Sequence, residues 1–110
     1  MVLRLRGGVA QLATKADFDS AIAGDKLVVV DFTATWCGPC QRIAPVFTKL
    51  AAEMPEVSFV KVDVDDNEET ATACGIQSMP TFQFYKSGKK VHEFSGASEE
   101  KIREAVAAHK

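Results

Sequence analysis

A buried strand that runs directly into a pair of cysteines limits what this chain can fold into more than any other feature. Residues 26–30 read Lys-Leu-Val-Val-Val, and this unbroken apolar run predicts a strand covered on both faces that continues through residues 31–35. The segment Trp36-Cys37-Gly38-Pro39-Cys40 then predicts a turn into a helix. Two thiols separated by two residues, where a strand feeds a helix, favour a site that cycles between dithiol and disulfide.

The size and composition indicate one ordinary globular domain. The chain has 110 residues, of which 46% are hydrophobic and 25% charged. A net charge of -2 leaves no basic stripe for phosphates, so we expect no nucleic-acid partner. The apolar runs are far shorter than the roughly 18 residues of a spanning helix, and no signal peptide is evident, so we expect no membrane segment. Three cysteines, an odd number, favour a reducing compartment, and we expect a cytoplasmic monomer.

The first eight residues stand apart from the rest of the chain. Residues 2–8 read Val-Leu-Arg-Leu-Arg-Gly-Gly, which resembles the carboxy-terminal end of ubiquitin. We interpret residues 1–8 as a flexible N-terminal leader or a fusion scar, outside a domain at 9–110. The alternative is a gene-fusion remnant that ubiquitin-cleaving proteases cut after Gly8.

Hydrophobic periodicity and turn residues predict the order β-α-β-α-β-α-β-β-α. Strands are expected at residues 9–13, 26–35, 57–64, 81–86 and 90–94. Helices are expected from the Thr14 cap to Gly24, from the cysteines to Pro55, over 67–74, and after the Ser98 cap. The strand–helix–strand units favour a parallel start to the sheet, and the last two strands form an antiparallel hairpin.

Two motifs give the chain a resemblance to the thioredoxin family from about Val9 to Ala108. Trp36-Cys37-Gly38-Pro39-Cys40 matches the family signature, and Met79-Pro80-Thr81-Phe82 matches the family's cis-proline loop. The phrases Val-Asp-Phe-Thr-Ala-Thr and Glu-Phe-Ser-Gly-Ala are most similar to cytosolic eukaryotic members. The resemblance implies an α/β thioredoxin fold, with a central mixed five-stranded sheet flanked by four helices, and no bound cofactor.

The positions of the two cysteines predict different roles for them. Cys37 comes first, at the helix N-terminus, where free backbone N–H groups and the positive end of the dipole favour a thiolate nucleophile. Cys40 lies one turn further, placed to resolve the mixed disulfide and release the reduced substrate. A zinc site is the alternative, but zinc needs four ligands and only Cys74, His92 and His109 remain, scattered along the chain. A purely structural disulfide is disfavoured because so short a loop constrains the unfolded chain little.

Asp31 is the second informative residue, because a carboxylate in an apolar strand is costly unless it is protonated, paired or useful. The structural alternatives are an edge position or a satisfied ion pair. By resemblance, Asp31 matches the family aspartate that moves a proton to or from the second cysteine, and Lys61 matches the lysine beside it. A raised pKa of the Asp31 carboxyl group would suit that role. The alternative for Lys61 is an ordinary solvated strand residue.

The resemblance also implies a substrate-binding surface beside the cysteines. In thioredoxins the loop before the cis proline packs against the cysteines, and the backbone of the preceding residue, here Met79, pairs with an extended substrate segment. The implied surface consists of Trp36, Gly38, Pro39, Ile76, Met79, Pro80, Gly96 and Ala97. Trp36 could alternatively be a core residue.

Two further positions bear on the site. Gln41 stands where many members of the family carry lysine, which removes a positive charge near the thiols. Cys74 corresponds to an extra cysteine of some animal-type members, where such thiols can be regulatory. We interpret Cys74 as a small buried apolar residue on a helix face shared with Ala71.

The combined evidence from sequence favours a protein disulfide reductase that uses the Cys37-Cys40 dithiol and is recycled by thioredoxin reductase. By resemblance, its acceptors include peroxiredoxins, methionine sulfoxide reductases and ribonucleotide reductase. The alternatives are an oxidant or isomerase of secretory disulfides and a non-catalytic module that holds a partner in the dithiol state. Gly38-Pro39 between the thiols, rather than a His-containing pair, weighs against the oxidant.

Overall fold

A computed structural model describes residues 8–110 of the chain. The order of elements is the predicted one. The strands are β1 (Ala10–Gln11), β2 (Val28–Thr33), β3 (Ser58–Asp63), β4 (Thr81–Lys86) and β5 (Lys89–Ser95). The helices are α1 (Lys15–Ile22), α2 (Gly38–Glu53), α3 (Glu68–Ala73) and α4 (Glu99–His109).

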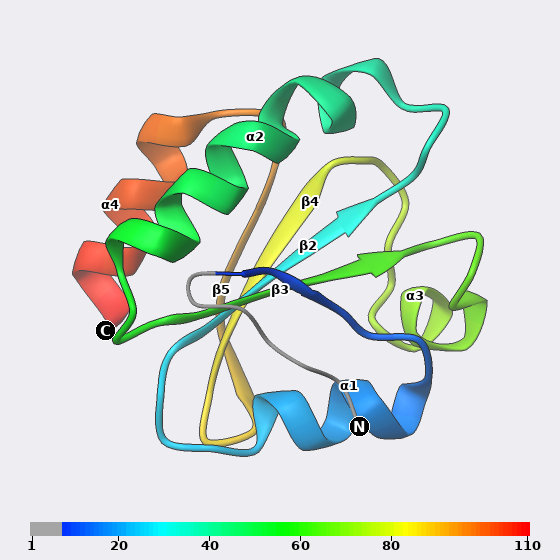
Figure 1. Ribbon diagram of the computed structural model, residues 1–110. Helices are drawn as coiled ribbons and strands as arrows, with labels where there is room; N and C mark the ends of the chain where they lie inside the picture. Colours follow the sequence, from blue (N-terminus) through cyan, green and yellow to red (C-terminus); the bar gives the residue numbers. More distant parts are fainter. Residues whose placement is uncertain (1–7) are drawn as a thin grey trace.

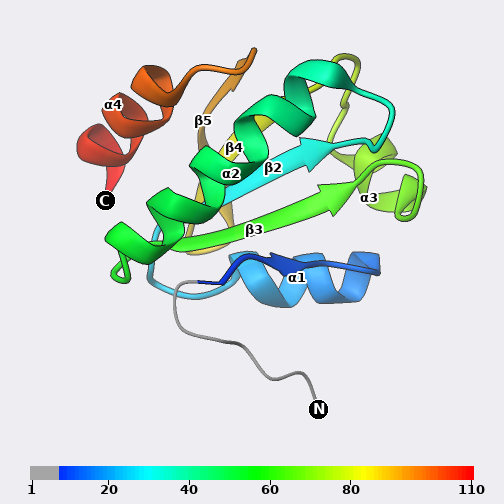
Figure 2. The same cartoon turned by 45° about the horizontal axis from the view of Figure 1, so that its top comes forward.

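The five strands form one mixed sheet in the order β1-β3-β2-β4-β5. The pairs β1–β3 and β2–β3 are parallel, whereas β2–β4 and β4–β5 are antiparallel. Helices α2 and α4 cover one face of the sheet, and α1 and α3 lie on the other (Figure 1). The turned view in Figure 2 separates these layers. The expected mixed five-stranded sheet flanked by four helices is confirmed.

Alternation along β2 divides the core between the two faces of the sheet. Val29 packs with α2 and α4, whereas Val28 and Val30 pack with α1 on the opposite face. Successive side chains of a strand point to opposite faces, so Asp31 shares the face of Val29 and lies beneath α2. Because β2 is the middle strand of the sheet, this carboxylate is delivered into the interior.

Local signals fixed several element ends. The side chains of Thr14, Asn67 and Ser98 accept hydrogen bonds from backbone N–H groups three residues on, at the starts of α1, α3 and α4. The β4–β5 turn has positive φ at Ser87 (54°) and Gly88 (82°), the geometry that a tight hairpin requires. The first strand was expected over residues 9–13 and is only two residues long, since Ala10 and Gln11 alone pair with β3 at the edge of the sheet.

Residues 1–7 of the expected leader lie outside the described residues, so the ubiquitin-like segment and its cleavage after Gly8 stay predictions. In the described part of the chain, none of the helices is long and apolar enough to cross a membrane.

Candidate active site

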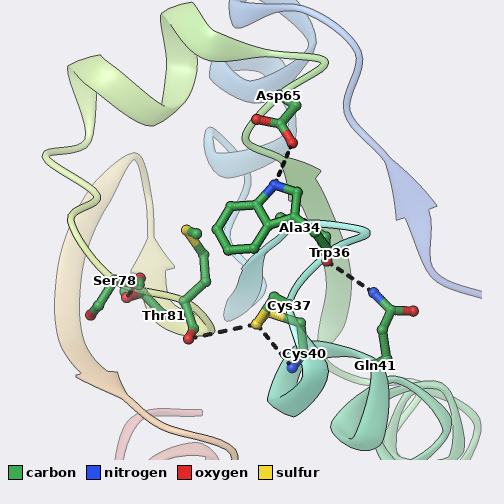
Figure 3. Close-up of a disulfide and its surroundings, with 9 residues drawn as sticks. Ala34, Trp36, Cys37, Cys40, Gln41, Asp65, Ser78 and Thr81 are labelled. Carbon is green, nitrogen blue, oxygen red and sulfur yellow. Dashed lines mark hydrogen bonds between the residues drawn. A yellow bond between two sulfur atoms is a disulfide. The ribbon is translucent and has the colours of Figure 1, made fainter.

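The two cysteines lie where β2 passes into α2, and they form a disulfide in this structure (Figure 3). Cys37 is the N-cap of α2, and its Sγ accepts a hydrogen bond from the Cys40 N–H at 3.2 Å. Cys37 is 6% exposed, whereas Cys40 is fully buried, and their Cα atoms are 5.2 Å apart. The first sulfur is therefore the more accessible one, and a helix N–H points at it.

The loop before the helix is held at one buried carbonyl group. The Ala34 oxygen accepts hydrogen bonds from the Cys37 N–H at 3.2 Å and from Gln41 Nε2 at 2.9 Å. Ala34 is fully buried and packs with both cysteines. Pro39 falls in the first turn of α2, where a missing backbone N–H costs no helical hydrogen bond.

Asp31 lies beneath this loop as a buried and incompletely paired carboxyl group. It is 3% exposed, and its Oδ1 has no hydrogen-bond partner. Burial raises the pKa of Asp31 from 3.8 to about 7, and the charge of Lys61 opposes this rise. Asp31 is not at an edge position, since β2 is the middle strand of the sheet. It is not in a satisfied ion pair either, since no salt bridge of Asp31 is formed among residues 8–110.

Lys61 is the neighbour of Asp31 in the parallel β2–β3 register. Both residues line a cavity of about 140 Å³. The cavity is bordered by strands, by the active-site loop and by α2; its lining residues are Gln11, Asp31, Thr33, Ala34, Thr35, Gln41, Ala44, Lys61 and Asp63. Ala34 connects the two parts of the site, because it borders this cavity and packs against Cys37 and Cys40.

The loop before β4 closes the site from a distant part of the chain. The Met79–Pro80 peptide bond is cis, as the resemblance implies. The Met79 carbonyl oxygen lies 3.8 Å from Cys37 Sγ, and the Pro80 carbonyl accepts the Gly96 N–H at 2.9 Å. Thr81 Oγ1 donates to the Ser78 carbonyl at 2.7 Å and steadies the same loop.

The expected substrate-binding residues differ in their exposure. Trp36 is 67% exposed, which contradicts the alternative that it belongs to the core. Gly38, Pro39, Gly96 and Ala97 are exposed, and Ile76 and Met79 are half-buried. Pro80 is buried, so it contributes its carbonyl contact to Gly96 rather than an exposed ring.

Two side-chain contacts of the site were not anticipated from the sequence. Trp36 Nε1 donates to Asp65 Oδ2 at 2.8 Å, and this bond fixes the exposed indole beside the cysteines (Figure 3). The sequence shows an acidic run after the third strand, but it does not show that Asp65 of this run contacts Trp36, 29 residues earlier. The Gln41 bond to Ala34 has no signal in the sequence either, because it joins a side chain to a backbone carbonyl group seven residues earlier.

Cys74 lies away from this site, at the C-cap of α3. It is half-buried rather than buried, and it packs with the core on the α1 face. Burial raises the pKa of the Cys74 thiol, against the effect of the Tyr85 hydroxyl, which lies 3.8 Å from its Sγ. Within residues 8–110, no group of three or more His, Cys, Asp or Glu side chains is arranged to hold a metal ion.

Comparison with known proteins decides the family. The family model described as thioredoxin matches residues 9–108. The chain belongs to the thioredoxin family. It is 61% identical over 102 residues to the thioredoxin of Geodia cydonium, an alignment that covers 90% of this chain and 96% of that one. Human thioredoxin is 52% identical over 100 residues, with 89% and 95% covered.

The solved structures agree with this assignment to the thioredoxins. The X-ray structure of Fasciola hepatica thioredoxin has a TM-score of 0.90 and 53% identity, and the match covers 93% of this chain and 100% of that chain. Thioredoxin from Trypanosoma brucei brucei has a TM-score of 0.91 at 34% identity, with 98% and 96% covered. The chain is a thioredoxin-type protein disulfide reductase with a Cys37–Cys40 pair, and its partners are disulfide-containing proteins and a reductase.

Proposed function

We propose that Cys37 is the nucleophile and Cys40 the resolving thiol of this reductase. The observation that carries the proposal is the Cys37 sulfur at the N-terminus of α2, where it accepts the Cys40 N–H. A helix N–H and the positive end of the helix dipole both stabilise a thiolate at that position. The buried Cys40 sulfur is shielded from a bulky protein substrate.

The exchange proceeds in two displacements at sulfur. The Cys37 thiolate attacks one sulfur of the substrate disulfide, a mixed disulfide forms, and the other substrate sulfur leaves as a thiolate. The Cys40 thiolate then attacks Cys37 Sγ, which forms the Cys37–Cys40 disulfide and releases the second substrate thiolate. Two electrons pass from the protein dithiol to the substrate, whose two thiolates take up protons.

We assign to Asp31 the task of accepting the Cys40 proton before the second displacement. A carboxyl group with a pKa of about 7 exchanges a proton readily near neutral pH. The cavity that Asp31 and Ala34 border is large enough for water, which would relay the proton to Asp31 past Ala34, the residue that packs against Cys40. Lys61, the register neighbour of Asp31, keeps part of the carboxyl group ionised by its charge.

The substrate segment is proposed to lie across Trp36, Gly38 and Pro39, towards Gly96 and Ala97. Met79 supplies backbone groups to an extended segment, in the manner of a strand added to an existing edge. The Met79 carbonyl lies 3.8 Å from Cys37 Sγ, so a segment paired there presents its own sulfur to the nucleophile. Ile76, which is half-buried, and Pro80, which is buried, complete the proposed surface.

We propose a thioredoxin reductase that uses flavin and NADPH as the electron donor, and peroxiredoxins, methionine sulfoxide reductases and ribonucleotide reductase as acceptors. One similar solved chain, with a TM-score of 0.87 and 33% identity, comes from work on thiol resolution in a yeast mitochondrial 1-Cys peroxiredoxin through glutathione and thioredoxin systems. The free Cys74 supports a reducing compartment, the cytoplasm, in which a monomer serves electron transport and redox homeostasis.

A trapping experiment tests the roles of the two thiols. The reduced Cys40→Ser variant, in a Cys74→Ser background, is mixed with insulin, and the linked peptides are identified by mass spectrometry. We expect a stable mixed disulfide on Cys37. The matched control is Cys37→Ser in the same Cys74→Ser background, which keeps Cys40, and we expect no adduct on it. Partner binding that persists without a covalent adduct would instead favour a non-catalytic module.

A further inference from the structure

The Gln41 side chain makes a contact that the exchange chemistry described above does not use. Its Nε2 donates a hydrogen bond of 2.9 Å to the Ala34 carbonyl oxygen, seven residues earlier in the chain (Figure 3). The same oxygen accepts the backbone N–H of Cys37 at 3.2 Å. One buried carbonyl therefore has two donors, one from the helix and one from the backbone of the proposed nucleophile.

These bonds close the active-site loop on itself. The Gln41 backbone N–H donates to the Cys37 carbonyl at 3.1 Å, while its side chain reaches back to Ala34. Gln41 thus contacts both ends of the turn between β2 and α2. The hydrogen bond from the Cys40 N–H to Cys37 Sγ depends on the position of this turn.

We propose that Gln41 is a positioning residue, which holds the Ala34 carbonyl against α2 and so keeps the Cys37 sulfur aligned with the Cys40 N–H. The proposal rests on the assignment of Cys37 as the nucleophile. Gln41 touches neither sulfur in the contacts of the described chain and acts through the loop backbone.

A neutral donor suits this place because Gln41 also borders the Asp31 cavity. A positive charge there would favour the ionised form of Asp31 and weaken its hold on a proton. An amide supplies the hydrogen bond without that charge. Glutamine therefore fixes the loop and leaves the protonation of Asp31 to burial and Lys61.

The test measures the reactivity of Cys37 in a Cys40→Ser/Cys74→Ser background, where it is the remaining thiol of the chain. The rate of alkylation by iodoacetamide is recorded against pH, together with the midpoint of urea unfolding. Gln41→Met keeps the size of the side chain and removes the donor. We expect the alkylation rate at pH 7 to fall by about two- to twelvefold, the range that corresponds to the loss of one net hydrogen bond.

Two further variants make the result specific. Gln11→Met removes an amide from the other side of the same cavity, where Gln11 bonds to Asp66 rather than to the loop, and we expect its alkylation profile to match the background. Gln41→Lys restores a donor, and about 1 M salt screens its charge. Under those conditions we expect alkylation within about twofold of the background, as for one restored hydrogen bond.

The outcomes separate the proposal from the function on which it rests. A lower unfolding midpoint in Gln41→Met with an unchanged alkylation profile would overturn the proposal, because Gln41 would then only stabilise the fold. An equal effect of Gln11→Met would also overturn it, since the cavity rather than the loop bond would be responsible. Failure of the thiol assignment appears elsewhere, as a mixed disulfide on Cys40 in the Cys37→Ser control of the trapping experiment.

Discussion

Replacing Asp31 by Asn is expected to stabilise the oxidised protein at neutral and alkaline pH. Asp31 is buried, its Oδ1 lacks a partner, and burial raises its pKa from 3.8 to about 7. The folded chain holds this proton more tightly than the unfolded chain does. The free energy of unfolding therefore falls as the pH rises from 3.8 to about 7. Above that range the destabilisation by Asp31 stays constant.

The size of the effect follows from the difference between the two pKa values. Each pH unit of difference is worth about 1.36 kcal/mol, so the ionised Asp31 costs about 4 kcal/mol at pH 8. By the same relation the cost is about 2 kcal/mol at pH 5 and close to zero at pH 3. Asparagine carries no charge at any of these values and has nearly the same shape. The gain of the Asp31→Asn variant should therefore grow with pH.

Urea unfolding of the oxidised protein at pH 3, 5 and 8 measures this gain. The matched control is Asp25→Asn, which removes the same charge from an exposed position and should change stability little at each pH. Turnover of the reduced protein should slow in Asp31→Asn, because Asn cannot accept the Cys40 proton. An equal gain at pH 3 and pH 8, or none at pH 8, would refute the reasoning, since neither result depends on ionisation of Asp31.

Lys61→Met should raise the pKa of Asp31 further, because the lysine charge lowers it, and should shift the rising limb of the pH–turnover profile to higher pH. Trp36→Ala should lower kcat/KM for insulin reduction by about tenfold, the cost of losing one exposed aromatic anchor, but leave reduction of a small aromatic disulfide nearly unchanged. Phe47→Ala should destabilise the protein by about 3–5 kcal/mol in urea unfolding, because Phe47 is buried against the rings of Phe59 and Phe82.

The local part of the fold could be predicted because its signals lie within a few residues. The apolar run of β2 indicated a buried strand, and the Thr14 and Ser98 side chains marked the starts of α1 and α4. Ser87 and Gly88 indicated the hairpin turn. Each of these features depends on neighbouring residues and on standard backbone chemistry.

The placement of β1 beside β3, with β2 inside the sheet, could not be obtained in this way. Strand order depends on pairings between distant segments, and periodicity carries no information about them. The adjacency of Asp31 and Lys61 in the β2–β3 register has the same origin. It was expected only through resemblance, whereas the structure gives it a geometric basis.

In the candidate site, too, local features could be predicted and contacts set by the folded chain could not. Cys37 and Cys40 could be recognised from their spacing at the start of a helix. The bond from Trp36 to Asp65 and the bond from Gln41 to Ala34 depend on side-chain directions that only the folded loop determines. The reacting sulfur atoms could therefore be predicted from the sequence, whereas the contacts that hold them could not.

Reduction of insulin disulfides, coupled to NADPH through thioredoxin reductase, tests the central claim most directly. We expect steady NADPH oxidation with the intact chain and none with Cys37→Ser. Turnover that continues in Cys37→Ser, or no turnover in the intact chain with its thiols reduced, would contradict it.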